Sequence, residues 1–147
     1  MRTLRFSISM LGALLAPAML LAQKQAIVPQ GQTASPNLTP GIRSGDVVYV
    51  SGQTGVSRDA PDSTIQGQTK KALENVQRVV EAAGGTMAGV LKCTVFLIDA
   101  KDFAGMNAAY RQAFPSEPPA RSTVVVAALV SPTARVEIEC IAALPHK

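Results

Sequence analysis

After the first twenty-two residues, the pattern of apolar and polar residues begins with a polar segment and a predicted short hairpin. Residues 23–40 are rich in Gln, Ser, Thr, Asn and Pro without a sustained period, which predicts an extended leader with ordered structure starting near Ile42. Residues 46–51 form a β-branched run closed by Gly52, and a second extended piece is expected at residues 54–57. We therefore expect a hairpin to open a domain spanning residues 41–147.

Two later segments have the spacing of amphipathic helices. Residues 63–66 match a capping box, and apolar residues then recur at helical spacing until Gly84 and Gly85. Asp102 opens a second helical stretch, which the prolines at 115, 118 and 119 end. Its apolar stripe consists of Phe103, Met106, Tyr110, Ala113 and Phe114.

Three further strands complete the predicted fold. They are expected at residues 90–98, 122–129 and 135–143, so the element order is ββ-α-β-α-ββ. This alternation predicts an α+β domain with a mixed sheet and both helices on one face, since right-handed crossovers return each helix to the same side. Residues 90–98 are apolar on both faces, which predicts that other subunits cover the helix-free face.

The first residues have the layout of a signal peptide. Arg2 and Arg5 precede an apolar run at residues 8–22 that ends in small residues. Pro17 interrupts this run, which is shorter than the roughly 20 residues of a membrane span. We therefore expect residues 1–22 to be cleaved near Ala18 or Ala22. The protein is then periplasmic or secreted without a stable membrane anchor, and a cytoplasmic location is the alternative.

Charge and histidine content narrow the function classes. The formal net charge is +4, but without Arg2 and Arg5 the count becomes 12 basic against 10 acidic residues, so 12 − 10 = +2. With this small charge, no Trp and few aromatic residues, nucleic acid is not expected as a partner. The only histidine, His146, is the penultimate residue, so histidine-based triads and multi-histidine zinc sites are not expected.

Cys93 and Cys140 lie in apolar, strand-like runs. In an oxidising compartment they could form a disulfide if their strands are neighbours. Buried free cysteine is also a common small core residue. On the sequence alone we favour two unpaired thiols.

Arg121 and Glu137 are the candidate catalytic residues. Arg121 stands where a proline-rich loop enters a strand, and its planar guanidinium suits the binding of a carboxylate, although a strand-edge arginine in solvent is the simpler interpretation. Glu137 and Glu139 share one face of the last strand. Either could act as a general base in a partly dry pocket, or both could be ordinary polar-face residues.

Two other positions have both a functional and a structural interpretation. Asn107 lies beside the apolar stripe of the second helix, where a buried amide needs partners and could position a loop or a ligand. Ser51 and Gly52 end the first strand, where glycine permits close approach of a ligand to the backbone. Turn formation is the simpler role for this pair.

Taken together, these residues resemble the RidA/YjgF family over about residues 41–143. The resemblance rests on seven segments in order: Tyr-Val-Ser-Gly-Gln at 49–53, Ala-Leu-Glu-Asn-Val at 72–76, Glu-Ala-Ala-Gly at 81–84, Thr-Val-Phe-Leu at 94–97, Asp-Phe-Ala-Gly-Met-Asn at 102–107, Pro-Ala-Arg-Ser-Thr-Val at 119–124 and Val-Glu-Ile-Glu at 136–139. The last two are the most specific of the family.

The resemblance implies a chorismate-mutase-like fold and a homotrimer with its sites in the clefts between subunits. By resemblance, Arg121 binds the substrate carboxylate and Glu137 places or activates the attacking water. The same resemblance carries Ser51, Gly52, Asn107 and Thr123 into the substrate-binding site. It also aligns Leu38 with a position that is aromatic in many relatives, and this departure puts the usual substrate range in doubt.

The expected activity is hydrolysis of 2-imino acids, such as 2-iminobutanoate and 2-iminopropanoate, to 2-oxo acids and ammonia. The resemblance implies neither a cofactor nor a metal. The alternative is a non-catalytic trimer of the same fold that binds small carboxylates or acts as a chaperone-like protein. A ribonuclease role ranks third because of the small charge.

Overall fold

The computed structural model describes residues 24–33, 35–56 and 63–145. The predicted signal peptide, residues 57–62 and His146 lie outside these ranges. The strands are β1 (Gln25–Ile27), β2 (Gly41–Ser44), β3 (Val47–Thr54), β4 (Val90–Leu97), β5 (Ala120–Val125) and β6 (Val136–Ala143). The helices are α1 (Ile65–Ala82) and α2 (Phe103–Ala113), with short 3-10 turns at Met87–Gly89 and Ala100–Asp102.

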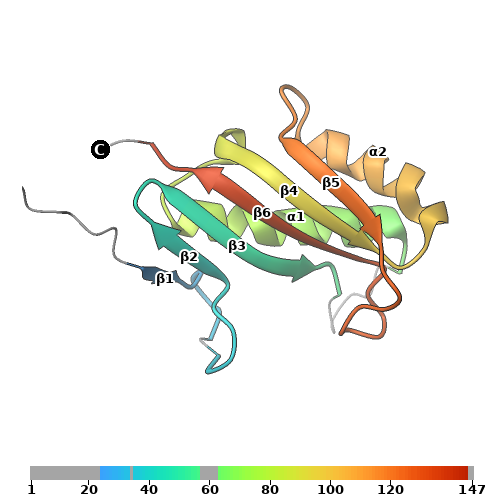
Figure 1. Ribbon diagram of the computed structural model, residues 1–147, viewed down its shortest axis with the longest axis horizontal. Helices are drawn as coiled ribbons and strands as arrows, with labels where there is room; N and C mark the ends of the chain where they lie inside the picture. Colours follow the sequence, from blue (N-terminus) through green and yellow to red (C-terminus); the bar gives the residue numbers. More distant parts are fainter. Residues whose placement is uncertain (1–23, 34, 57–62, 146–147) are drawn as a thin grey trace, which may run out of the picture.

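The six strands form one mixed sheet in the order β1-β2-β3-β6-β4-β5 (Figure 1). The β4–β5 pair is parallel and the other neighbouring pairs are antiparallel. The last strand, β6, is inserted between β3 and β4, so the C-terminal part of the chain joins the two halves of the sheet. This arrangement confirms the predicted α+β fold.

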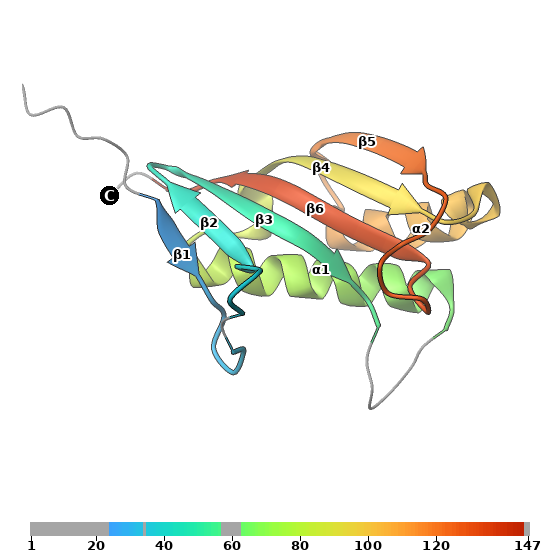
Figure 2. The same ribbon diagram turned by 60° about the horizontal axis from the view of Figure 1, so that its bottom comes forward.

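Both helices cover the same face of the sheet, as predicted (Figure 2). The crossovers from β3 through α1 to β4, and from β4 through α2 to β5, move in the same direction along the sheet. Two right-handed crossovers in one direction place their helices on one side. Between the layers lies a continuous core that includes Val76 and Val80 of α1, Val95 of β4 and Ile138 of β6.

Helix α1 begins and ends close to the predicted residues. Thr64 is the N-cap, and its side chain accepts a hydrogen bond from the Gly67 amide at 3.1 Å. The cap thus lies one residue after the Ser63 of the predicted capping box. After α1, Gly84 adopts a positive φ of 90°, which glycine tolerates and which ends the helix.

The N-terminal part of the sheet differs from the prediction in two respects. The hairpin partner of β3 is β2, which precedes it, with Arg43 opposite Val48, whereas we expected the partner at residues 54–57. The sheet also starts earlier than Ile42, because β1 pairs with β2 and Ile27 is buried in the core. The polar composition of residues 23–40 gave no sign of this strand, because Ile27 is the one buried residue among its three.

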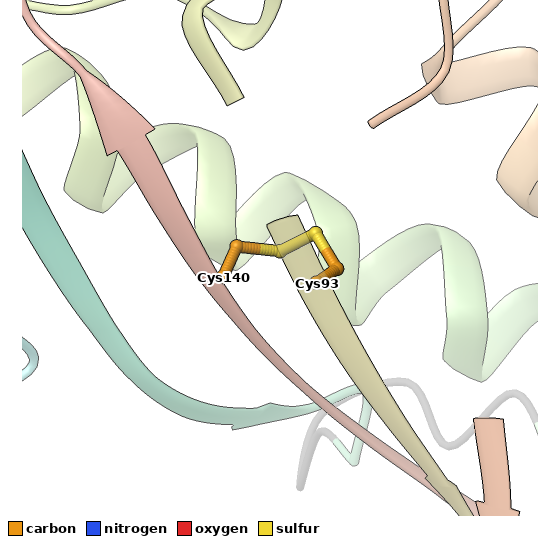
Figure 3. Close-up of a disulfide and its surroundings, with 2 residues drawn as sticks. All are labelled: Cys93 and Cys140. Atoms are coloured by element: carbon orange, nitrogen blue, oxygen red, sulfur yellow. A yellow bond between two sulfur atoms is a disulfide. The ribbon is translucent and has the colours of Figure 1, made fainter. Parts of the chain in front are cut away.

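The prediction of two free thiols is wrong, because Cys93 and Cys140 form a disulfide (Figure 3). The two residues face each other on the antiparallel strands β4 and β6, with a Cα–Cα distance of 4.1 Å. Both point into the core beneath the helices and are 0% and 2% exposed. Sequence could not show this pairing, because it depends on the insertion of β6 beside β4.

Candidate functional site

Arg121 lies at the start of β5, the edge strand next to β4. It is opposite Cys93 in the parallel ladder, and paired residues point to the same face, so its side chain is on the helix-covered side. There its guanidinium donates to the Asn107 Oδ1 atom at 2.7 Å. A second donor contacts the Met106 Sδ atom at 3.8 Å, and the Tyr110 ring centroid lies 4.6 Å from Cζ.

Among the residues that the structure describes, no acidic side chain neutralises the charge of Arg121. No carboxylate lies within ion-pair distance of it in the described ranges, and its side chain is only partly buried. A guanidinium carries five N–H donors, of which the contacts with Asn107 and Met106 use two. The remaining donors are held in a fixed plane and can bind a small anion, most effectively a carboxylate.

Thr123 belongs to the same group, because it lies two residues after Arg121 on the same face of β5. Its hydroxyl is buried and has no hydrogen-bond partner among the residues described. A buried hydroxyl without a partner is costly, so a ligand or a neighbouring chain would be a favourable contact. The predicted residues Asn107, Arg121 and Thr123 therefore come together.

A second group forms around Glu137 on β6. Glu137 is paired with Thr54 of β3, where the ladder shifts its register between Val50 and Gln53. Gly52 lies in this irregular stretch, and a Cβ atom there would overlap the Glu137 carboxylate. Glycine is thus required for the carboxylate to lie against the strand.

Ser51 connects this second group to the preceding loop. Its hydroxyl donates to the Thr39 carbonyl at 2.6 Å, and its amide donates to the Pro40 carbonyl at 2.9 Å. These bonds hold the backbone at residues 39–40 beside β3. Leu38 precedes them, and its side chain is 57% exposed. Leu38 therefore lies next to this group and has free surface to offer a ligand or a neighbouring chain.

The two groups lie on opposite faces of the sheet. Arg121 is opposite Cys93, while Glu137 is opposite Phe96 on the helix-free face. Their positions are three residues apart along β4 and two strand spacings apart across it, which puts their Cα atoms about 14 Å apart. One small substrate cannot contact both side chains of a single chain.

The sequence pattern put Phe103, Met106 and Tyr110 on the apolar stripe of the second helix and did not predict their contact with Arg121. Phe103 is at the outer limit of such a contact, with its ring centroid 6.0 Å from the Arg121 Cζ atom. Burial raises the pKa of Tyr110 to about 12, against the opposing effect of the Arg121 charge, so its phenol is neutral at physiological pH. Met106 lies one residue before Asn107 and Tyr110 three residues after it on the same helix. This spacing is the feature of the sequence that could have placed them beside the same partner as Asn107.

The beginning of α2 is bonded to the beginning of β6 by an ion pair that the sequence did not predict, between the buried Asp102 and the partly exposed Arg135. The Arg135 guanidinium bonds both Asp102 carboxylate oxygens, and the Nε–Oδ2 distance is 3.0 Å. Gln68 adds two bonds, from its amide nitrogen to the Thr133 carbonyl and from the Arg135 amide to its oxygen. These bonds connect the helix that carries Asn107 with the strand that carries Glu137.

Neither a metal-binding cluster nor a membrane-spanning helix is present in the same ranges. Over residues 24–33, 35–56 and 63–145, no three His, Cys, Asp or Glu side chains are grouped so that they could hold a metal ion. None of the helices described there is long and apolar enough to cross a membrane.

Comparison with known proteins assigns the family. The endoribonuclease L-PSP family model matches residues 30–144, and the chain therefore belongs to this family, which includes the YjgF proteins. It is 39% identical over 105 residues to the mitochondrial protein mmf2 of Schizosaccharomyces pombe, covering 69% of this chain and 83% of that protein.

Solved structures of relatives agree with the fold. The crystal structure of the YjgF gene product of E. coli has a TM-score of 0.74 and 34% identity, covering 81% of this chain and 98% of that chain. A structure described as a putative endoribonuclease L-PSP from Entamoeba histolytica has a TM-score of 0.75 and 37% identity, covering 83% and 100%. The sequence resemblance to the RidA/YjgF family is thereby confirmed.

Proposed function

We propose that the protein is a 2-imino acid deaminase that hydrolyses substrates such as 2-iminobutanoate and 2-iminopropanoate to 2-oxo acids and ammonia. The observation that carries this proposal is the Arg121 guanidinium, which is oriented by Asn107 at 2.7 Å and has no carboxylate partner in the described chain. A small substrate with a carboxylate group supplies the missing negative charge.

The separation of the two groups supports a site built from two copies of the chain. Arg121, Asn107 and Thr123 of one copy would face Ser51, Gly52 and Glu137 of its neighbour. A closed ring of copies related by rotation repeats this contact at every interface, and a homotrimer is the assembly that the family resemblance implies. Exposed apolar residues such as Leu91, Val124 and Val130 provide surface for such contacts.

The proposed reaction is addition of water followed by loss of ammonia. Arg121 binds the substrate carboxylate and thereby fixes the adjacent imine carbon. The Glu137 carboxylate accepts a proton from water as the water oxygen bonds to that carbon, and the same proton passes to the imine nitrogen as the C=N π bond breaks, which regenerates the carboxylate. The resulting carbinolamine loses ammonia as its hydroxyl proton passes to the leaving nitrogen and the hydroxyl becomes the carbonyl of the 2-oxo acid. Positioning and general base catalysis together supply the acceleration.

The direct test measures ammonia and 2-oxobutanoate released from enzymatically generated 2-iminobutanoate. We expect acceleration by the wild-type protein and none by Arg121→Ala. Arg121→Lys keeps the charge but loses the planar arrangement of donors, so it should retain the fold and lose most of the turnover. A well-folded wild-type assembly that binds 2-oxobutanoate without accelerating hydrolysis would instead support the carboxylate-binding alternative.

Glu137 and Glu139 offer a matched pair for the role of the base. They lie two residues apart on the same face of β6, but only Glu137 packs against Gly52. Glu137→Gln should lower kcat by about 100-fold or more, as expected for loss of a general base, whereas Glu139→Gln should remain near wild type. Equal effects of the two substitutions would contradict the assignment.

We further propose that the protein acts outside the cytoplasm, after removal of residues 1–22. The Cys93–Cys140 disulfide supports this location, because such bonds persist in oxidising compartments. Cell fractionation and N-terminal sequencing of the natural protein test the proposal. A full-length chain in the cytoplasm with reduced cysteines would contradict it.

A further inference from the structure

Tyr110 is placed directly against the guanidinium of Arg121. Its ring centroid lies 4.6 Å from the Arg121 Cζ atom, well within the range of about 6 Å for a cation over an aromatic face. The side chain is 4% exposed, so water does not weaken this contact on the tyrosine side. The Phe114 ring lies 4.8 Å from the Tyr110 ring and supports it.

The hydroxyl group does not explain the burial of Tyr110. It has no hydrogen-bond partner in the part of the chain that the structure describes, although buried tyrosine hydroxyls ordinarily find one. The phenol is also neutral at physiological pH, so it does not form an ion pair with the arginine. The contact with Arg121 is therefore made by the face of the ring.

Three side chains of α2 together orient the guanidinium. Met106, Asn107 and Tyr110 all project from α2, and each contacts Arg121. Asn107 and Met106 each contact one terminal nitrogen, while the Tyr110 ring packs against the guanidinium. An arginine constrained in this way loses less conformational freedom when it binds a carboxylate.

We propose that Tyr110 is a positioning residue of the site, whose ring holds the Arg121 guanidinium in the orientation that receives the substrate carboxylate. This inference rests on the proposed function for its kinetic consequence, but the packing of Arg121 can be tested without it. Because the ring acts through Arg121, it affects carboxylate binding in the ground state and the transition state alike. Arg121→Lys removes the planar donors themselves, whereas loss of the ring leaves them in place and a bound carboxylate can still orient them, so KM should rise much more than kcat falls.

The test compares Tyr110→Phe with Tyr110→Leu. Phenylalanine keeps the aromatic face and removes only a hydroxyl without a partner, so its KM for 2-iminobutanoate should stay within about twofold of wild type. Leucine removes the face, so the guanidinium must be ordered when the carboxylate binds, and KM and the Kd for 2-oxobutanoate should both rise about tenfold, the cost of immobilising one long side chain. Equal constants for the two variants would overturn the proposal.

Phe114→Leu is the matched control for damage to the core. Phe114 is a buried aromatic residue at the end of the same helix, and it packs on Tyr110. The leucine variants at positions 110 and 114 should lose similar thermal stability, but only Tyr110→Leu should raise KM strongly. Equal increases in KM would assign the effect to general loosening of α2 and overturn the specific role of Tyr110.

An NMR measurement separates this inference from the proposed function. The Arg121 Nε–H signal, assigned by comparison with Arg121→Lys, should show a ring-current shift that persists in Tyr110→Phe and disappears in Tyr110→Leu. If the wild-type protein neither turns over 2-iminobutanoate nor binds 2-oxobutanoate, the deaminase proposal fails on that result alone. An Arg121 signal that is the same in all tyrosine variants would overturn the positioning role, whatever the activity.

Discussion

Reduction of the Cys93–Cys140 disulfide should cost the protein a large part of its stability. The bond joins β4 to β6 and closes a loop with a sequence separation of 47 residues, which corresponds to roughly 4 kcal/mol of lost chain entropy in the unfolded state. Domains of this size are stable by only about 5–15 kcal/mol, so the loss is a major fraction. It should lower the midpoint of urea unfolding by roughly 2 M.

The assay is equilibrium urea unfolding of the mature protein with and without a phosphine reductant, at one protein concentration because the protein is proposed to be an oligomer. The Cys93→Ala/Cys140→Ala variant is the control, since its unfolding midpoint should not respond to the reductant. Before unfolding, the bond should resist reduction, because its cysteines are 0% and 2% exposed.

Two results would refute this reasoning. Unfolding midpoints that agree with and without reductant would show that the bond contributes little to stability. Two reactive thiols for each chain, measured in denaturant on protein that was never reduced, would show that the bond does not form in solution. The second result would also remove the main structural support for a location outside the cytoplasm.

Three other predictions concern the packing around the candidate site. Arg135→Met should lower the free energy of unfolding in urea by about 3 kcal/mol, because it leaves the buried Asp102 carboxylate without its cation. Asp102→Asn removes that charge and should cost less, so equal losses in the two variants would contradict this order. Gly52→Ala should lower kcat at least about tenfold, because the added Cβ atom displaces the Glu137 carboxylate, while the circular dichroism spectrum stays unchanged. Wild-type turnover in this variant would argue against Glu137 acting from its observed position. Tyr110 has its pKa raised to about 12, so its contribution to stability is complete below about pH 10 and is lost as the pH rises toward 12. In a variant whose other tyrosine is phenylalanine, phenolate absorbance should therefore appear near pH 12, and a midpoint near 10 would contradict the buried position.

Local patterns in the sequence were sufficient for both helices, for the strands β3, β4, β5 and β6 and for much of the candidate site. Helical spacing located α1 and α2, and period-two alternation put Glu137 and Glu139 on the face opposite Val136 and Ile138. The position of Asn107 beside an apolar stripe indicated an amide with a partner, and that partner is Arg121. These features depend on residues a few positions apart in the chain, so the spacing of apolar and polar residues is enough to predict them.

Which elements lie side by side was decided only by the tertiary structure. The insertion of β6 between β3 and β4 brings Cys140 opposite Cys93 and Glu137 beside Gly52, across long separations in the chain. It also puts Glu137 and Arg121 on opposite faces of the sheet. Strand order depends on the total burial achieved by alternative pairings, and no local pattern encodes that sum. The sequence therefore indicated the residues of the candidate site, and the fold determined that one chain holds them in two separate groups.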